Sequence, residues 1–237
     1  MKRMILAASA LMALCPMASA QEVETLAEPE PGQPDYAALM AEAAWDWRPD
    51  DLIFLNGLNE FDELVRQAEG GEWASVGILR PSSGDPRVVF VDERDGVTEV
   101  MLSELTEMRS DDGYAVYRVR GAEGKGLGFL TSYSLFSAYG RPFDPLMLFG
   151  NGQFYNAELP FEAAMSEGHV IAEPRRLGDF ADPDSPMVKA ILSGWREHPY
   201  CVAALSAEDC WQVVQDIAVV TPGALLSSGK LERIYPD

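Results

Sequence analysis

The stretch ASVGILRPSSGDPRVVFVD, residues 74–92, carries the pattern that decides the fold. Ala74–Leu79 and Arg87–Asp92 are short runs rich in β-branched and apolar residues, which is typical of strands with a buried face. Pro81–Pro86, between them, combines Pro, Ser, Gly and Asp, the residues that favour turns. The stretch therefore predicts two antiparallel strands joined as a hairpin.

Similar patterns continue on both sides of this hairpin. Asp51–Leu55 is a short apolar run before an Asn-Gly turn, and Tyr114–Val119 alternates apolar and polar residues. We also expect extended segments over Val97–Met101, Ile217–Thr221 and Leu231–Tyr235, and helices over Tyr36–Trp47, Asn59–Ala68, Pro186–Arg196 and Ser206–Val214. Because strands cluster in the middle with helices on both sides, the predicted class is α+β, with a central antiparallel sheet packed on helices. Alternation and helix faces nominate the core residues Ile53, Phe54, Val76, Ile78, Val89, Phe90, Val116 and Leu159.

The first 20 residues have the organisation of a cleaved signal peptide. Lys2 and Arg3 precede an apolar run over Met4–Leu14, and Ala18-Ser19-Ala20 is a small-x-small cleavage signal. That run is shorter than the roughly 20 residues that a membrane-spanning helix needs. We therefore expect cleavage after Ala20 and a periplasmic or secreted protein, with an uncleaved anchor as the alternative.

The residues after the signal divide into a leader and one domain. Residues 21–34 are acidic, rich in Pro and almost free of large apolar side chains, so we expect a flexible leader. Residues 35–237 are long enough for one domain with a sizeable core. Cys15 raises lipidation as an alternative, but Leu14 stands where a lipid-modified Cys normally has a small residue.

The charge narrows the classes of partner. The chain carries a formal net charge of −20, and no cluster of Lys and Arg interrupts it. Acidic surfaces repel phosphate backbones and anionic lipids, so we expect no nucleic-acid partner. We also expect no cofactor and no transmembrane segment in the mature protein.

Two cysteines follow the signal peptide, Cys201 and Cys210. In an oxidising compartment, two nearby cysteines most often form a disulfide. Free thiols and a metal site that includes His198 are the alternatives. The metal site lacks an obvious fourth ligand and a standard spacing, so we expect no metal.

Six segments together carry a resemblance to a known family. They are Asp51-Leu-Ile-Phe-Leu55, Ala74-Ser-Val-Gly-Ile-Leu79, Tyr139-Gly-Arg-Pro-Phe-Asp144, Phe154-Tyr-Asn-Ala-Glu-Leu159, Val220-Thr-Pro-Gly-Ala-Leu225 and Leu231-Glu-Arg-Ile-Tyr235. In order and spacing they resemble the YiiX/YebB-like branch of the NlpC/P60 cysteine hydrolases, a circularly permuted papain-like group. Its members typically show GD-I-I-F, S-H-V-G-I, G-x-x-Y-D and Y-C-S-E-L segments, followed by T-P-x-D-L and a terminal strand. The resemblance covers residues 50–237 and implies a papain-like fold.

The chemistry of that family depends on a Cys at the start of a helix and a His on a neighbouring strand. The positive end of the helix dipole favours the thiolate, and the imidazole acts as the general base. A third polar group holds the imidazole in its useful tautomer. This chain departs from the family at both reactive positions, because Ser75 stands at the His position and Asn156 at the Cys position. The third polar position falls at Asp92.

The resemblance therefore implies a hydrolase scaffold without its thiol and imidazole. Our first hypothesis is a non-catalytic member whose cleft binds an amide-, peptide- or acyl-bearing ligand in the cell envelope. The residues expected to line that cleft are Ser75, Asp92, Tyr155, Asn156 and Glu158. An active amide or ester hydrolase with a rearranged site is the alternative, and it requires His169, His198 or a cysteine to approach Asn156. A structural protein with a filled cleft is a third possibility.

Overall fold

The computed structural model describes residues 45, 47–83, 85–107, 113–121 and 128–236. The predicted signal peptide and leader lie outside the described residues, as does most of the helix expected over Tyr36–Trp47. The description below therefore concerns the unit that begins at Trp45.

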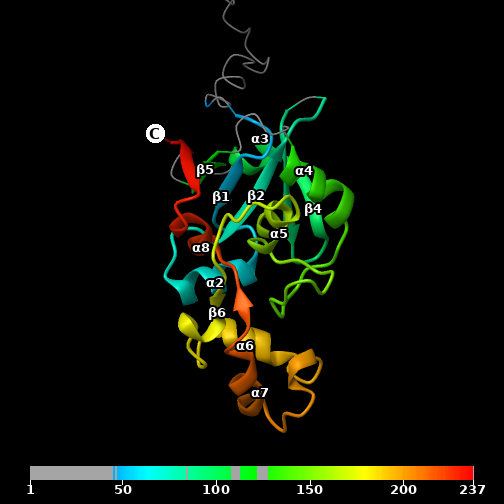
Figure 1. Cartoon of the computed structure of the whole chain (residues 1–237), viewed down its shortest axis with the longest axis vertical. Coiled ribbons are helices and arrows are strands. Elements are labelled where there is room, and N and C mark those ends of the chain that lie inside the picture. The colour runs from blue at the N-terminus through cyan, green and yellow to red at the C-terminus, as the bar shows by residue number, and fades with distance from the viewer. Residues whose placement is uncertain (1–44, 46, 84, 108–112, 122–127, 237) are drawn as a thin grey trace, which may run out of the picture. The chain divides into compact units, whose positions relative to one another are not determined.

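A six-stranded sheet organises this unit, and all its neighbouring strands are antiparallel (Figure 1). Its strand order is β4-β3-β2-β1-β5-β8. The strands are β1 (Leu52–Leu55), β2 (Ser75–Arg80), β3 (Arg87–Asp92), β4 (Gly96–Met101), β5 (Tyr114–Val119) and β8 (Leu231–Tyr235). The predicted hairpin is confirmed as β2 and β3. The α+β class is confirmed as well.

The helices predicted over Asn59–Ala68, Pro186–Arg196 and Ser206–Val214 are confirmed as α2 (Glu60–Glu69), α6 (Pro186–Ser193) and α7 (Ala207–Val214). The other described helices are α3 (Leu102–Thr106), α4 (Phe129–Tyr133), the π-helix η2 (Ser134–Ala138), α5 (Glu158–Ser166) and α8 (Pro222–Ser227). Short elements complete the described chain: β6 (Arg175–Arg176), η3 (Leu177–Asp179), η4 (Pro199–Cys201) and β7 (Ala218–Val219). Gly70 ends α2 in the left-handed region at φ 68°, which glycine adopts without steric cost.

Each face of the sheet carries its own core. Phe54, Val76, Ile78 and Val89 point to the face that α2 and α5 cover. Ile53, Leu79, Val88 and Val116 point to the opposite face, where Trp45 and α3 pack. All eight nominated core residues are buried, as strand alternation and helix faces predicted.

Helices α6 and α7 lie together beyond one end of the sheet (Figure 1). Cys201 and Cys210 form a disulfide there, with a Cα–Cα distance of 5.0 Å, as the sequence led us to expect. No described helix has the length and apolar character required to cross a membrane.

Strands β2 and β3 pair over only half of their length, and this positions the candidate site. Their register joins Ile78–Arg80 to Arg87–Val89. Beyond that point, Ser75 to Gly77 pair with β1 alone, whereas Phe90 to Asp92 pair with β4. Polar backbone groups in the resulting gap need other partners, because a buried unpaired group is costly.

Candidate functional site

Side chains from α2, from the residue before it and from the turn that leads into α5 fill the gap between β2 and β3. Asp62 of α2 stands at the centre. Ser75 Oγ donates to Asp62 Oδ2 at 2.6 Å, and Asn59 Nδ2 donates to the same oxygen at 2.8 Å. Asn156 Nδ2 is the third donor to Oδ2. We call these four residues the Asp62 network.

The side-chain amide of Asn156 hydrogen-bonds the backbone of Val91, which lies beyond the part of β3 that pairs with β2. Its Oδ1 accepts from the backbone N–H of Val91 at 2.8 Å, and its Nδ2 donates to the carbonyl of Val91 at 3.0 Å. Asn59 Nδ2 donates to the same carbonyl at 2.7 Å. Both hydrogens of each amide are therefore engaged, one on Asp62 and one on Val91.

The Asp62 network is closed to solvent. Ser75 is 0% exposed, Asn156 1%, Asp62 3% and Asn59 6%. Burial raises the pKa of Asp62 to about 7, although the hydrogen bonds from Ser75, Asn59 and Asn156 oppose that shift. The carboxyl group is therefore close to half ionised at neutral pH.

The structure brings together two of the residues that the sequence nominated, Ser75 and Asn156, but joins them through Asp62. Asp92, the expected third polar group, makes its described contacts elsewhere. Its Oδ1 accepts from the backbone N–H groups of Arg94 and Asp95, at 2.8 and 2.9 Å, in the turn before β4. Asp62, and not Asp92, is the acidic side chain that contacts both Ser75 and Asn156.

A local signal could have pointed to Asp62. It follows Phe61 and precedes Val65 by three residues, and all three side chains are buried on α2. A carboxylate on the apolar face of an amphipathic helix needs hydrogen-bond donors from the packing partner. The sequence does not show which strand supplies them.

The other two nominated residues bond outside the Asp62 network. The hydroxyl of Tyr155 accepts from Val220 N at 3.0 Å, and Glu158 Oε2 accepts from Tyr155 N at 3.3 Å. Glu158 Oε1 is buried without a hydrogen-bond partner. Burial, followed by the charge of Glu162, raises the pKa of Glu158 to about 9, so this side chain is neutral at pH 7.

The described contacts of the histidines and cysteines lie away from Asn156. The His169 ring packs on Phe129 with centroids 5.1 Å apart, and His198 Nδ1 accepts from Tyr200 N at 3.2 Å. Cys201 and Cys210 are bonded to each other. Among the described residues, no group of three or more His, Cys, Asp or Glu side chains is arranged to hold a metal ion.

The chemistry open to the Asp62 network is therefore narrow. Its members are two amides, one hydroxyl and one carboxyl group, which supply neither a thiolate nor an imidazole. The bond from Ser75 to Asp62 is the one pairing that resembles a nucleophile with its base. Because both side chains are buried, a substrate could reach this pair only after local opening.

The sheet and its helices define a YiiX-like α+β fold. A solved structure that the chain resembles is that of the metalloprotein yiiX from Escherichia coli O157:H7, DUF1105. The similarity covers 81% of this chain and 99% of that chain, with a TM-score of 0.61 and 18% identity. No family model and no curated protein matches the sequence. At this identity the resemblance shows the fold.

Proposed function

We propose that this chain is an exported, non-catalytic protein of the permuted NlpC/P60 type that acts by binding. The observation that carries the proposal is the Asp62 network, in which Ser75 and Asn156 bond to one buried carboxyl group. The family resemblance assigns these two residues to the His and Cys positions. The network supports the sheet across the gap between β2 and β3. A reactive pair would instead need access to a substrate.

The ligand we propose is an amide-, peptide- or acyl-bearing molecule of the cell envelope, in keeping with the family resemblance. The buried Asp62 network leaves no exposed donor for it. Leu192 and Trp211 line a separate cavity of about 550 Å³ between α6 and α7, with Lys189 and Glu208 also among its lining residues. Its lining combines apolar side chains with polar and charged ones, which suits a ligand that carries a short apolar group beside an amide or acyl oxygen.

A pair of covalent probes tests the absence of catalysis. The folded protein, with its disulfide intact, is treated with a fluorophosphonate for serine and with an electrophile for cysteine hydrolases. We expect neither probe to label it, and a known serine hydrolase in the same tube controls for reactivity. Fluorophosphonate labelling that disappears in Ser75→Ala would overturn the proposal.

The same experiment addresses a second candidate, a serine hydrolase that uses Ser75 with Asp62 as its base. The 2.6 Å hydrogen bond and the pKa of about 7 favour this pairing. Activity would then require local opening, so labelling should increase under mild destabilisation in which the protein stays folded. Ser228→Ala, which removes a hydroxyl outside the network, is the matched control.

A further inference from the structure

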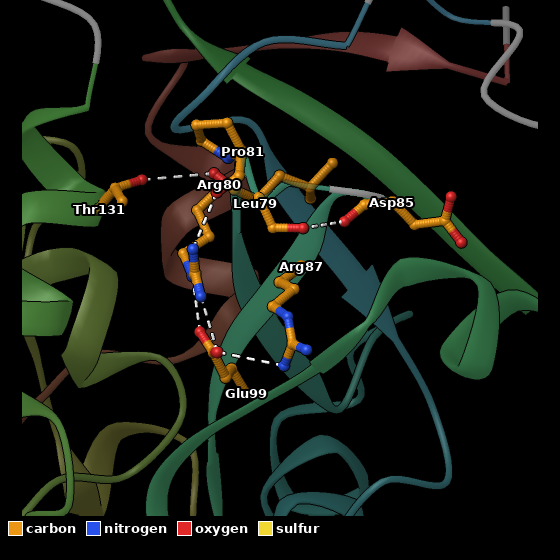
Figure 2. Close-up of polar contacts among 8 residues, drawn as sticks. Leu79, Arg80, Pro81, Asp85, Arg87, Glu99 and Thr131 are labelled. Carbon is orange, nitrogen blue, oxygen red and sulfur yellow. Dashed lines mark hydrogen bonds and ion pairs between the residues drawn. The ribbon is translucent and has the colours of Figure 1, made fainter.

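A second polar cluster lies at the opposite end of β2 from Ser75 and joins three strands (Figure 2). Arg80 of β2 donates to Glu99 of β4 through Nε at 2.6 Å and Nη2 at 2.7 Å. Arg87 of β3 donates to the same carboxylate through Nη1 at 3.2 Å. We call these residues the Arg80–Glu99–Arg87 cluster.

The register of the sheet places both guanidinium groups on one face. Arg80 and Arg87 are direct cross-strand partners, so their side chains share a face. Glu99 is opposite Val89, which lies two residues from Arg87 and therefore on that face as well. Like charges directly opposite each other destabilise a sheet, and one carboxylate compensates for only one of them.

The two arginines are held differently. Arg80 is fixed on three sides, because its Nη1 also donates to the carbonyl of Pro81 at 2.8 Å. Arg87 is engaged only through Nη1 in its described contacts, and its side chain is 32% exposed. Its remaining N–H donors are therefore available to a ligand. A guanidinium group can engage an oxyanion through two parallel hydrogen bonds.

The surplus positive charge of the cluster lies on the side of Arg87. Glu99 hydrogen-bonds Arg80 through two N–H groups and raises the pKa of Arg80, so its carboxylate is directed mainly at that guanidinium group. The nearby carboxylate of Asp85 points away from Arg87 (Figure 2). Its Oδ2 accepts from Ser103 at 3.4 Å. Asp85 thus leaves the surplus positive charge uncancelled by direct contact.

We propose that the Arg80–Glu99–Arg87 cluster binds the anionic head of a small ligand, a carboxylate or a phosphate group. Arg87 makes the direct contact, and Arg80 engages Glu99 through two hydrogen bonds, so the carboxylate leaves the cluster with one positive charge in surplus. The formal net charge of −20 repels polyanions, so the favoured ligand carries a single anionic group. This site is distinct from the Asp62 network and does not depend on the proposed function.

A titration monitored by ¹⁵N NMR at constant temperature tests the proposal. The protein is titrated with inorganic phosphate and, separately, with acetate, each at an ionic strength held constant with chloride. We expect saturable shifts of the Arg80, Arg87 and Glu99 amides with at least one of the two anions. Which anion saturates distinguishes a phosphate from a carboxylate ligand.

Two variants separate a site from a general charge effect. Arg87→Gln removes the proposed contact and should weaken binding by about tenfold or more, as expected when a charged hydrogen-bond partner is lost. Arg94→Gln removes one charge from an exposed position in the next turn and should leave binding unchanged. Shifts that saturate with neither phosphate nor acetate, or equal affinity in Arg87→Gln and the parent protein, would overturn the proposal. The NMR spectrum of each variant shows whether it is folded.

Discussion

Asp62 illustrates how a single buried carboxyl group can decide what a site does. Three donors converge on one of its oxygens, which favours the ionised form, while complete burial favours the neutral form. Burial is the stronger effect, so the pKa rises to about 7. The outcome is a polar core element that titrates near neutral pH.

This balance predicts how stability depends on pH. The pKa of Asp62 is raised from 3.8 to about 7, so its contribution is fully present below pH 3.8 and is lost as the pH rises through 7. Relative to Asp62→Asn, the free energy of unfolding should fall by up to about 4 kcal/mol over that range. Urea denaturation at several pH values measures it. Asp95→Asn, at an exposed position, is the control, and parallel profiles for the parent and Asp62→Asn would contradict the prediction.

Glu158 leads to a second prediction at the same scale. Its pKa is raised from 4.5 to about 9, so the folded protein at pH 7 holds a proton that the unfolded chain has released. Taking up that proton on folding costs free energy at pH 7. Glu158→Gln removes this cost and keeps the shape of the side chain, so we expect the free energy of unfolding to rise by about 1–3 kcal/mol at pH 7 and to be unchanged near pH 4. Thermal unfolding at both pH values measures the gain, with the exposed Glu167→Gln as control. A loss of stability at pH 7 would show that the ionised form is needed.

At the scale of elements, the helix α2 determines what fills the gap beside β2. Asn59 precedes its first turn, and Asp62 and Val65 follow on the buried face. The helix thus brings an amide and a carboxyl group to strands that the sequence alone shows only as apolar runs. A change in the rotation of α2 would separate Asp62 from Ser75 and leave its donors unpaired.

The disulfide leads to a prediction about the local stability of α6 and α7. The bond closes a short loop, since Cys201 and Cys210 are nine residues apart in the sequence. The chain-entropy estimate for such a loop is about 2–3 kcal/mol. In the double variant Cys201→Ser, Cys210→Ser, amide hydrogen exchange should therefore be faster than in the parent protein in α6 and α7 and unchanged in β1 and β2. Uniform acceleration across the sheet would mean that these helices unfold together with the whole domain.

At the scale of the whole molecule, strands were the most predictable feature. Alternation placed Ile53 and Val116 on the sheet and correctly buried both, because the two faces of a strand are set by neighbouring residues in the chain. The hairpin of β2 and β3 was predicted because its turn residues are local. The partial pairing of these two strands was not, since it depends on what α2 and α5 insert between them.

The candidate site was only partly predictable for the same reason. Ser75 and Asn156 were nominated by resemblance, and the structure places them on one carboxyl group. Asp92 was nominated by its place on the strand, but it bonds within its own turn. Asp62 was missed because a long-range packing contact, between residues far apart in the chain, gives it its role.

By itself, the sequence determined the α+β class and the strand hairpin, which follow from periodicity and turn chemistry, both local properties. That Asn156 and Ser75 stand where a cysteine hydrolase has its thiol and imidazole is a prediction from resemblance. Only the tertiary structure decided that Asp62 joins the two positions and that Arg80 and Arg87 converge on Glu99. Those contacts depend on strand register and helix packing, and the free energy of burying several elements together determines both.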